Sequence, residues 1–219
     1  RGKSGMTNEN MDNMITIPFD GGSFSAYHPY ASDQDGIKHP GLVLIHEVWG
    51  LNDHIQDVAD RFAGQGYNVL APDLLSQTGI TEKVDQTILA EIKNPLTRDD
   101  AQKRMRAATA PIRVPEFAEI TVEKLKACVS MLLADEQVSG KVVVLGFCFG
   151  GTYSYALAVA DHRLSAAVPF YGHAPDPIDT VKTISCPILA FYGEDDTALI
   201  ESLPDLKDKM SEYGHDFEV

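Results

Sequence analysis

Short hydrophobic runs alternate with amphipathic segments along most of the chain. Residues 41–46 (GLVLIH) and 67–71 (YNVLA) are apolar runs of strand length, and between them the apolar spacing of residues 55–63 is helical. Asn52 or Asp53 is the predicted cap of that helix. This order predicts a strand, a helix and a second strand. Continuous apolar strands are typical of a parallel sheet that helices cover on both faces.

The same alternation continues toward the C-terminal end. The hydrophobic pattern predicts a mostly helical segment with proline breaks, then further strands and helices, at residues 80–134, 141–145, 150–161, 164–170, 187–192 and 201–213. Near the start, two β-prone runs at residues 14–19 and 23–28 flank a turn and predict an antiparallel hairpin at a sheet edge. The expected fold class is therefore α/β, with a doubly wound, mainly parallel sheet and an N-terminal antiparallel hairpin.

Length and composition narrow the class of protein. The 219 residues predict a single domain over residues 14–219, and residues 1–13 are interpreted as a tag remnant and flexible N-terminus. A net charge of −14 argues against nucleic-acid and anionic-membrane partners. Three scattered cysteines without a visible secretion signal favour a cytoplasmic protein. The uncharged residues 142–160 are interpreted as a buried strand followed by a buried helix rather than as a membrane span.

The most specific chemical pattern surrounds Cys148. The segment Gly146, Phe147, Cys148, Phe149, Gly150 fits GxCxG, directly after one predicted strand and before a predicted helix. Small residues on both sides permit a sharp turn that presents the central side chain at the top of the sheet. The helix N-terminus there is expected to lower the pKa of the thiol, so Cys148 is a candidate nucleophile. The competing interpretation is an inert buried cysteine.

Two acidic segments follow strands at the same predicted edge of the sheet. Glu47 comes just after residues 41–46 and, taken alone, is best interpreted as a solvated loop carboxylate; beside a thiol at the same sheet edge it is a candidate base or gate. His46 and Glu47 begin like the zinc motif HExxH, but position 50 is Gly, so no metal site is predicted. Asp196 follows residues 187–192 and stands after the nucleophile, as an acid does in α/β hydrolases. Asp195 is the second choice, and either residue could instead be a simple helix-start acid.

The chain resembles the dienelactone hydrolase family, cysteine hydrolases of the α/β-hydrolase superfamily. The resemblance covers residues 14–219 and rests on the stretches LVLIHEVWGLN, YNVLAPDLLS, LGFCFGG, AAVPFYG and CPILAFYGEDD. It implies that Cys148 is the nucleophile, that Asp196 orients a histidine, and that Glu47 helps to generate the thiolate. It also implies an oxyanion hole formed by the backbone N–H groups of Phe149 and Val48, and no metal or organic cofactor.

The histidine of such a triad is not evident. Only His215 follows Asp196, and the helix between them should place His215 at the opposite edge of the sheet, with the next strand beginning at DFEV. We therefore expect the fold to be truncated at the C-terminus, without the family's histidine, last strand and final helix. A cloning boundary, an incomplete gene prediction or genuine loss would each explain this. His173, after the strand at 164–170, is a possible substitute, and an apolar sheet face would be exposed.

The sequence thus predicts a hydrolase of small lactones or esters that works through an acyl-enzyme on Cys148. Two alternatives stay open: a broader carboxylesterase or thioesterase, and a catalytically silent α/β-hydrolase relative. Candidate cations for a substrate carboxylate lie between Arg98 and Arg113, but Arg104 can instead pair with Asp100, and a solvated helix face is the favoured interpretation, so no residue there is assigned to the site. The expected partner is a small-molecule substrate, and the protein is expected to be a monomer or homodimer.

Overall fold

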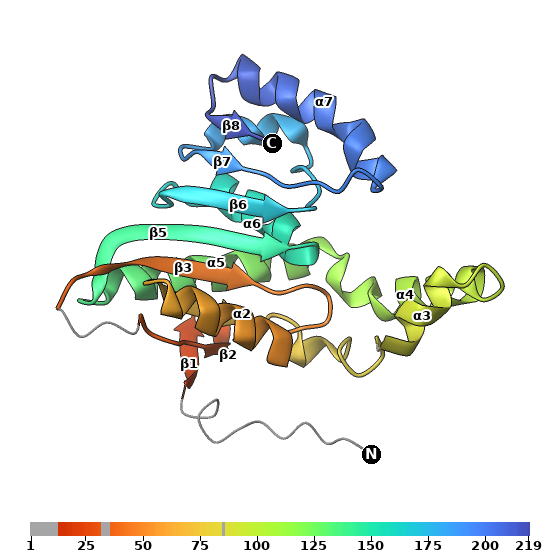
Figure 1. The fold of residues 1–219 in the computed structure, drawn as a ribbon, viewed down its shortest axis with the longest axis horizontal. Helices are drawn as coiled ribbons and strands as arrows, with labels where there is room; N and C mark the ends of the chain where they lie inside the picture. The colour runs from red at the N-terminus through yellow and green to blue at the C-terminus, as the bar shows by residue number, and fades with distance from the viewer. Residues whose placement is uncertain (1–12, 32–35, 85) are drawn as a thin grey trace.

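The computed structural model describes residues 13–31, 36–84 and 86–219 of the chain. Within these residues the strands form one eight-stranded sheet in the order β1-β2-β4-β3-β5-β6-β7-β8 (Figure 1). The strands are β1 (Met14–Phe19), β2 (Gly22–Tyr27), β3 (His39–Ile45), β4 (Asn68–Pro72), β5 (Val138–Phe147), β6 (Ala166–Phe170), β7 (Ile188–Leu189) and β8 (Phe217–Glu218). The prediction for residues 1–13 falls almost entirely outside the described residues.

The sheet has the predicted mixture of strand directions. β1 pairs with β2, and β2 with β4, in antiparallel register, whereas every neighbouring pair from β4 to β8 is parallel. The N-terminal hairpin therefore lies at one edge of a doubly wound sheet, which confirms the predicted fold class. The carboxyl ends of the parallel strands meet at one edge, the edge at which ligands bind in such sheets.

Helices cover the two faces of the sheet unequally. One helix, α2, lies against one face, and α5, α6 and α7 lie against the other (Figure 1). The helices are α2 (Asp53–Gly64), α3 (Gln86–Lys93), α4 (Arg98–Ala108), α5 (Pro115–Ala134), α6 (Phe149–Ala160) and α7 (Thr197–Glu212). Short 3-10 turns occupy Ser76–Thr78, Ala110–Ile112 and Ile178–Thr183. Asn52 caps α2, since its side-chain oxygen accepts a hydrogen bond from the Ile55 amide at 3.1 Å.

Strand alternation divides the apolar side chains of the sheet between two cores. Along β5, Val142 and Val144 face the layer of α5 and α6, whereas Leu145 faces α2. The uncharged stretch 142–160 is indeed a strand running into a helix, because β5 ends at Phe147 and α6 begins at Phe149. In the part of the chain that the structure describes, no helix has both the length and the apolar character needed to cross a bilayer.

The C-terminal elements differ in extent from their prediction. β7 has two ladder residues, whereas the pattern predicts a strand of six. Beyond Leu189 the pairing with β6 continues as an isolated parallel bridge between Phe170 and Phe191. α7 begins at Thr197, four residues earlier than predicted, and its first turn buries Leu199. The last strand, whose absence the sequence predicts, is present: Phe217–Glu218 of DFEV form β8, which pairs with β7 at the edge of the sheet, so this part of the expected truncation is wrong.

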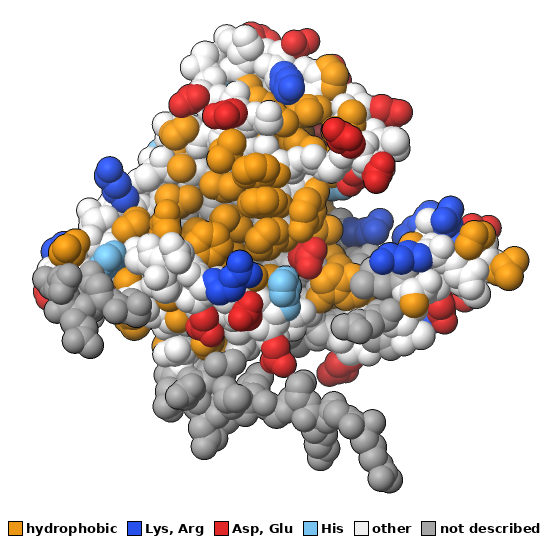
Figure 2. Space-filling view, viewed as in Figure 1, with side chains coloured by type: hydrophobic (Ala, Val, Ile, Leu, Met, Phe, Trp, Pro, Cys, Tyr) orange, Lys and Arg blue, Asp and Glu red, His pale blue; other side chains and the backbone are white. Residues whose placement is uncertain are grey.

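Part of the sheet face that carries α2 is open. Hydrophobic side chains gather over β5, β6 and β7 beside α2 (Figure 2). Leu189 and Phe191 are 39% and 42% exposed, and Phe147 and Phe170 are half-buried at the boundary of the α2 core. The expected exposure of an apolar sheet face is confirmed.

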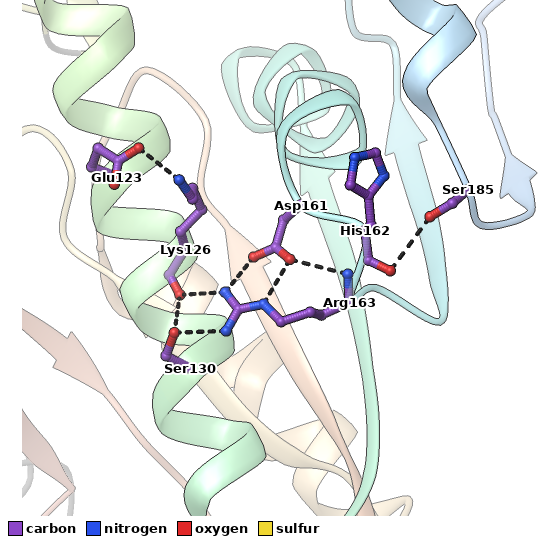
Figure 3. A network of polar contacts seen from close by, with 7 residues as sticks. All are labelled: Glu123, Lys126, Ser130, Asp161, His162, Arg163 and Ser185. Atoms are coloured by element: carbon purple, nitrogen blue, oxygen red, sulfur yellow. Dashed lines mark hydrogen bonds and ion pairs between the residues drawn. The ribbon is translucent and has the colours of Figure 1, made fainter.

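A charged network joins the end of α6 to α5 (Figure 3). Asp161 is buried, and its carboxylate accepts hydrogen bonds from Arg163 Nη2 at 2.6 Å and Nε at 2.8 Å. Arg163 Nη1 in turn donates to Ser130 Oγ at 2.9 Å, and Nη2 to the Lys126 carbonyl at 3.4 Å. Burial alone raises the pKa of Asp161, but the hydrogen bonds and charge of Arg163 outweigh it and lower the pKa.

Replacing Asp161 with Asn is expected to destabilise the fold by about 1–2 kcal/mol at neutral pH. The value is at the low end for a charged hydrogen bond because water screens the half-exposed Arg163. A lowered folded-state pKa contributes stability above the usual Asp value of about 3.9, and this stability is lost as the pH falls through the folded value. Urea unfolding at neutral and acidic pH should therefore show that the wild type is more stable than the variant, by an amount that shrinks as the pH falls.

Asp179→Asn, which breaks the exposed pair with Lys209, is the control and should change the free energy of unfolding little. Equal effects of the two changes would contradict this role.

Candidate active site

Cys148 lies at a sharp turn between β5 and α6. Its backbone has φ 53° and ψ −109°, a conformation that non-glycine residues rarely adopt and that is found at functional turns. The Cys148 amide donates to the Phe170 carbonyl of β6 at 3.0 Å, and its carbonyl accepts from the Thr152 amide at 3.0 Å. The turn thus presents an exposed thiol at the carboxyl edge of the sheet and the start of a helix, as GxCxG predicts.

Two glycines of the motif are required by close backbone contacts. A Cβ atom on Gly146 would lie 2.2 Å from the Gly150 carbonyl oxygen, and one on Gly150 would lie 2.3 Å from the Ile45 carbonyl oxygen. Real side chains do not tolerate such distances, so both positions exclude any larger residue. Gly150 brings the end of β3 directly against the turn that holds Cys148.

The pKa of the Cys148 thiol shifts in the direction opposite to the one that the sequence predicts. Burial raises the pKa of Cys148; the amide of Phe149 lowers it, and the negative charges of Glu47 and Asp196 raise it further, so the net direction is upward. The helix N-terminus was expected to lower the pKa, but desolvation and two carboxylates outweigh it. The resting thiol is therefore protonated at neutral pH. Because the charges of Glu47 and Asp196 act on the thiol, both carboxylates lie near Cys148 at the carboxyl edge of the sheet.

Glu47 and Val48 lie in the loop that follows β3. The Glu47 side chain is half-buried, and burial raises its pKa, while the nearby His54 acts in the opposite direction. A carboxylate with a raised pKa is a stronger proton acceptor than an ordinary surface glutamate. Val48 packs against the main core, and the Gly50 amide donates to the Glu47 carbonyl at 3.1 Å, which closes the loop into a turn.

Asp196 occupies the N-cap position of α7, and its side chain is exposed. Its amide donates to the Gly193 carbonyl at 3.1 Å, which fixes the turn from β7 into the helix. Asp195 is exposed as well. Asp196 is the one of the two whose charge acts on the pKa of Cys148, which favours it over Asp195 as the acidic residue of the site.

The histidines are distributed over both edges of the sheet. His215 precedes β8, which runs parallel to β7, so it lies at the amino edge, opposite Cys148, as predicted. His173 lies at the carboxyl edge, where its amide donates to Thr152 Oγ1 at 3.0 Å. Its exposed side chain is on the loop after β6. His54, on the first turn of α2, is the imidazole whose charge acts on Glu47.

Tyr171 is a further neighbour of the site. It follows β6 with φ 40°, a second positive φ at a non-glycine residue, and its amide donates to the Phe191 carbonyl at 2.7 Å. Burial raises the pKa of its hydroxyl, and the charges of Glu47 and Cys148 add to this. The sequence signal for this proximity is the position of Tyr171 one residue past a strand that neighbours β5.

The arginines of α4 and of the segment after it are ion-paired or exposed at the surface. Arg104 contacts both Glu91 and Asp100, which confirms the predicted i,i+4 pair. Arg106 and Arg113 are exposed at the surface. Across residues 13–31, 36–84 and 86–219, no three His, Cys, Asp or Glu side chains gather in a way that could hold a metal ion.

An exposed thiol on a strained strand-to-helix turn, in a doubly wound sheet with an antiparallel hairpin, defines an α/β hydrolase. The chain belongs to the dienelactone hydrolase family, whose family model matches residues 24–219. It is 31% identical over 192 residues to a Saccharolobus solfataricus protein named "Putative carboxymethylenebutenolidase", covering 81% of this chain and 74% of that protein. It is also 30% identical to "Protein usf" of Aquifex pyrophilus, covering 82% and 72% of the two chains.

Solved structures agree on the fold. A Klebsiella pneumoniae structure described as a "Putative Dienelactone Hydrolase" superposes with a TM-score of 0.75 at 22% identity, over 94% of this chain and 82% of that one. A dienelactone hydrolase from Anabaena variabilis superposes with a TM-score of 0.64 at 14% identity, over 94% and 82%. The protein is thus a dienelactone hydrolase-like hydrolase that acts on ester bonds of a small-molecule substrate.

Proposed function

We propose that this protein hydrolyses small lactones or esters by nucleophilic attack of Cys148. The observation that carries the proposal is the position of this thiol: it is exposed, held at φ 53° at the start of α6, and within electrostatic reach of Glu47 and Asp196. A strained backbone that exposes a nucleophilic atom beside a half-buried carboxylate is an arrangement suited to covalent catalysis.

The first chemical step moves one proton. Cys148 gives its proton to the Glu47 carboxylate, which leaves a thiolate and a neutral carboxylic acid. Burial disfavours the charged form of each group, so the resting pair of thiol and carboxylate carries a single negative charge before and after the transfer. The thiolate then attacks the carbonyl carbon of the substrate, forming a C–S bond and a negatively charged tetrahedral oxygen.

The backbone amides of Phe149 and Val48 are proposed to bind that oxygen. Phe149 is the first residue of α6, so its N–H is one of the free donors at a helix start, and it already acts on the sulfur of Cys148. When the intermediate collapses, the C–O bond breaks and the leaving oxygen takes the proton from Glu47. Water, deprotonated by Glu47, then attacks the thioester carbonyl carbon. The C–S bond breaks, the carboxylic acid is released, and the Cys148 thiolate takes the proton back from Glu47.

Asp196 is proposed to orient an imidazole at this edge and to keep the site negatively charged. Burial first, and then the charges of Glu47 and Asp196, raise the pKa of Cys148, so that the thiol stays protonated until a substrate reaches the site. A thiol that ionises only during the reaction is protected from oxidation and alkylation between turnovers. We infer that the acidic environment is therefore part of the mechanism.

The proposed substrate class is a small lactone with a conjugated carboxylate, which the name of the Saccharolobus solfataricus relative points to. The test compares hydrolysis of 4-carboxymethylenebut-2-en-4-olide with that of a neutral lactone, p-nitrophenyl acetate and an acetyl thioester. A kcat/KM that is largest for the carboxylated lactone supports the proposal. A preference for the neutral ester or the thioester would favour a broader esterase or thioesterase, and no turnover of any of these by folded protein would contradict the proposal.

A further inference from the structure

His46 is a buried side chain for which the proposed reaction has no use. It follows β3 directly, and its imidazole is fully buried. Its Nδ1 lies 2.6 Å from the Glu47 carbonyl oxygen, and its Nε2 accepts a hydrogen bond from the Leu74 amide at 3.1 Å. The ring therefore joins the loop after β3 to the segment that follows β4.

These two partners determine the tautomer of His46. The Leu74 amide can only donate, so Nε2 carries no proton, and the Glu47 carbonyl can only accept, so Nδ1 carries the proton. The imidazole is neutral, with one donor and one acceptor, and both are used. Burial lowers the pKa of His46, which agrees with a neutral ring, although the Glu47 carbonyl and the charge of Asp73 act in the opposite direction.

The bond from Nδ1 sets the direction of an amide at the active site. The Glu47 carbonyl and the Val48 N–H belong to one planar, trans peptide group, so they point in opposite directions. His46 holds the Glu47 carbonyl toward the buried ring, together with the Gly50 amide that donates to the same oxygen at 3.1 Å, and so turns the Val48 N–H away from that ring. Rotation of this peptide would remove the donor from its position.

The same ring also contacts the other side of the site. It stacks on Phe149 with ring centroids 5.8 Å apart and an interplanar angle of 6°. The backbone is close as well, because a Cβ on Gly150 would lie 2.8 Å from the His46 carbonyl oxygen. One residue thus touches both segments that carry the proposed oxyanion donors, Val48 and Phe149.

We propose that His46 is a positioning residue that orients the Val48 amide and holds it in register with the Phe149 amide, so that the two form one oxyanion hole. This inference rests on the proposed function, because it assigns His46 to a hole that only an acyl-transfer reaction needs. His46 acts through backbone groups and does not touch the substrate. A side chain that only filled space would need neither hydrogen bond.

The test uses His46→Leu, which keeps volume but removes both hydrogen bonds, and His46→Gln, whose amide supplies one donor and one acceptor. The burst of p-nitrophenolate from p-nitrophenyl acetate measures acylation, and iodoacetamide measures alkylation of Cys148, a substitution at a saturated carbon that needs no oxyanion hole. His46→Leu should slow acylation about 10- to 100-fold, by the cost of a displaced oxyanion donor, and leave alkylation unchanged. His46→Gln should restore most of the acylation rate.

A matched control is His28→Leu. His28 is also buried, its Nδ1 donates one hydrogen bond to the Val69 carbonyl at 2.6 Å, and it lies beside the start of β4, at the opposite edge of the sheet. It should lower the unfolding temperature without changing the ratio of acylation to alkylation. If His46→Leu does not fold, His46→Asn, whose shorter amide cannot reach both partners, takes its place against His46→Gln.

Two results would overturn the inference: acylation at the wild-type rate in His46→Leu, or acylation and alkylation that fall in proportion. The second result would mean that His46 only packs the turn around Cys148. Failure of the proposed function has a different signature, since Cys148→Ala would then hydrolyse the ester at the wild-type rate whatever occupies position 46.

Discussion

Replacing Cys148 with Ala is expected to lower the kcat for lactone and ester hydrolysis by at least about 10⁴-fold, as removal of a covalent nucleophile does in other acyl-transfer enzymes. The methyl group of alanine cannot form the C–S bond, so the two-step reaction through an acyl-enzyme is lost. The side chain is exposed, so its removal opens no internal cavity. Steady-state hydrolysis of p-nitrophenyl acetate, with unfolding temperature measured in parallel, checks this expectation.

Cys186→Ala is the matched control for the nucleophile. Cys186 is buried beside the start of β7, where burial raises the pKa of its thiol, and it has no part in the proposed site. This variant should hydrolyse the ester at the wild-type rate. Comparable loss in both cysteine variants would point to damage to the fold rather than to loss of a nucleophile, and full activity of Cys148→Ala would refute the mechanism.

Replacing Glu47 with Gln is expected to have two opposite effects. Hydrolysis should fall about 10²- to 10⁴-fold, because the thiol loses its proton acceptor. Alkylation of Cys148 by iodoacetamide should at the same time become faster at neutral pH. Burial first, and then the charges of Glu47 and Asp196, raise the pKa of the thiol, so removing the Glu47 charge lowers that pKa and increases the thiolate fraction.

The pH dependence of alkylation separates these two effects. In the wild type the inflection should lie above the ordinary thiol value of about 8.5, and in Glu47→Gln it should move to lower pH. Asp57→Asn, an exposed change of equal charge on α2, is the control and should move neither the inflection nor the hydrolysis rate. An inflection that stays in place in Glu47→Gln would show that the two groups do not interact.

Much of the site could be predicted because it follows from strand ends. Cys148, Glu47 and Asp196 each follow a predicted parallel strand, and the carboxyl ends of such strands meet at one edge of a sheet. The spacing of Gly146 and Gly150 predicts the sharp turn without further information. The placement of His215 at the amino edge followed from the length of the helix between it and Asp196.

The electrostatics could not be predicted from local motifs. The effect of a helix start on a thiol is a local rule, whereas the pKa of Cys148 depends on burial and on carboxylates contributed by two other strands. The role inferred for His46 likewise depends on a residue that is distant in the sequence. Its partner Leu74 lies 28 positions away, and the sequence offered only an incomplete metal motif at this position.

The limits of α7 and β7 were missed for a different reason. The acidic run before α7 predicts a helix start but does not identify the first helical residue. In the folded chain the helix begins at Thr197, and its first turn buries Leu199. β7 is short because its ladder depends on the register of β6 and β8, which no local pattern encodes.

Mapping the acyl group tests the central claim most directly. The protein is mixed with p-nitrophenyl acetate, quenched in acid within milliseconds, digested and analysed by mass spectrometry. The mechanism predicts one acetyl group on the peptide that contains Cys148, formed at the rate of the p-nitrophenolate burst and absent from Cys148→Ala. Turnover without an acetyl group on this peptide, or with one on a different residue that forms at the burst rate, would contradict it.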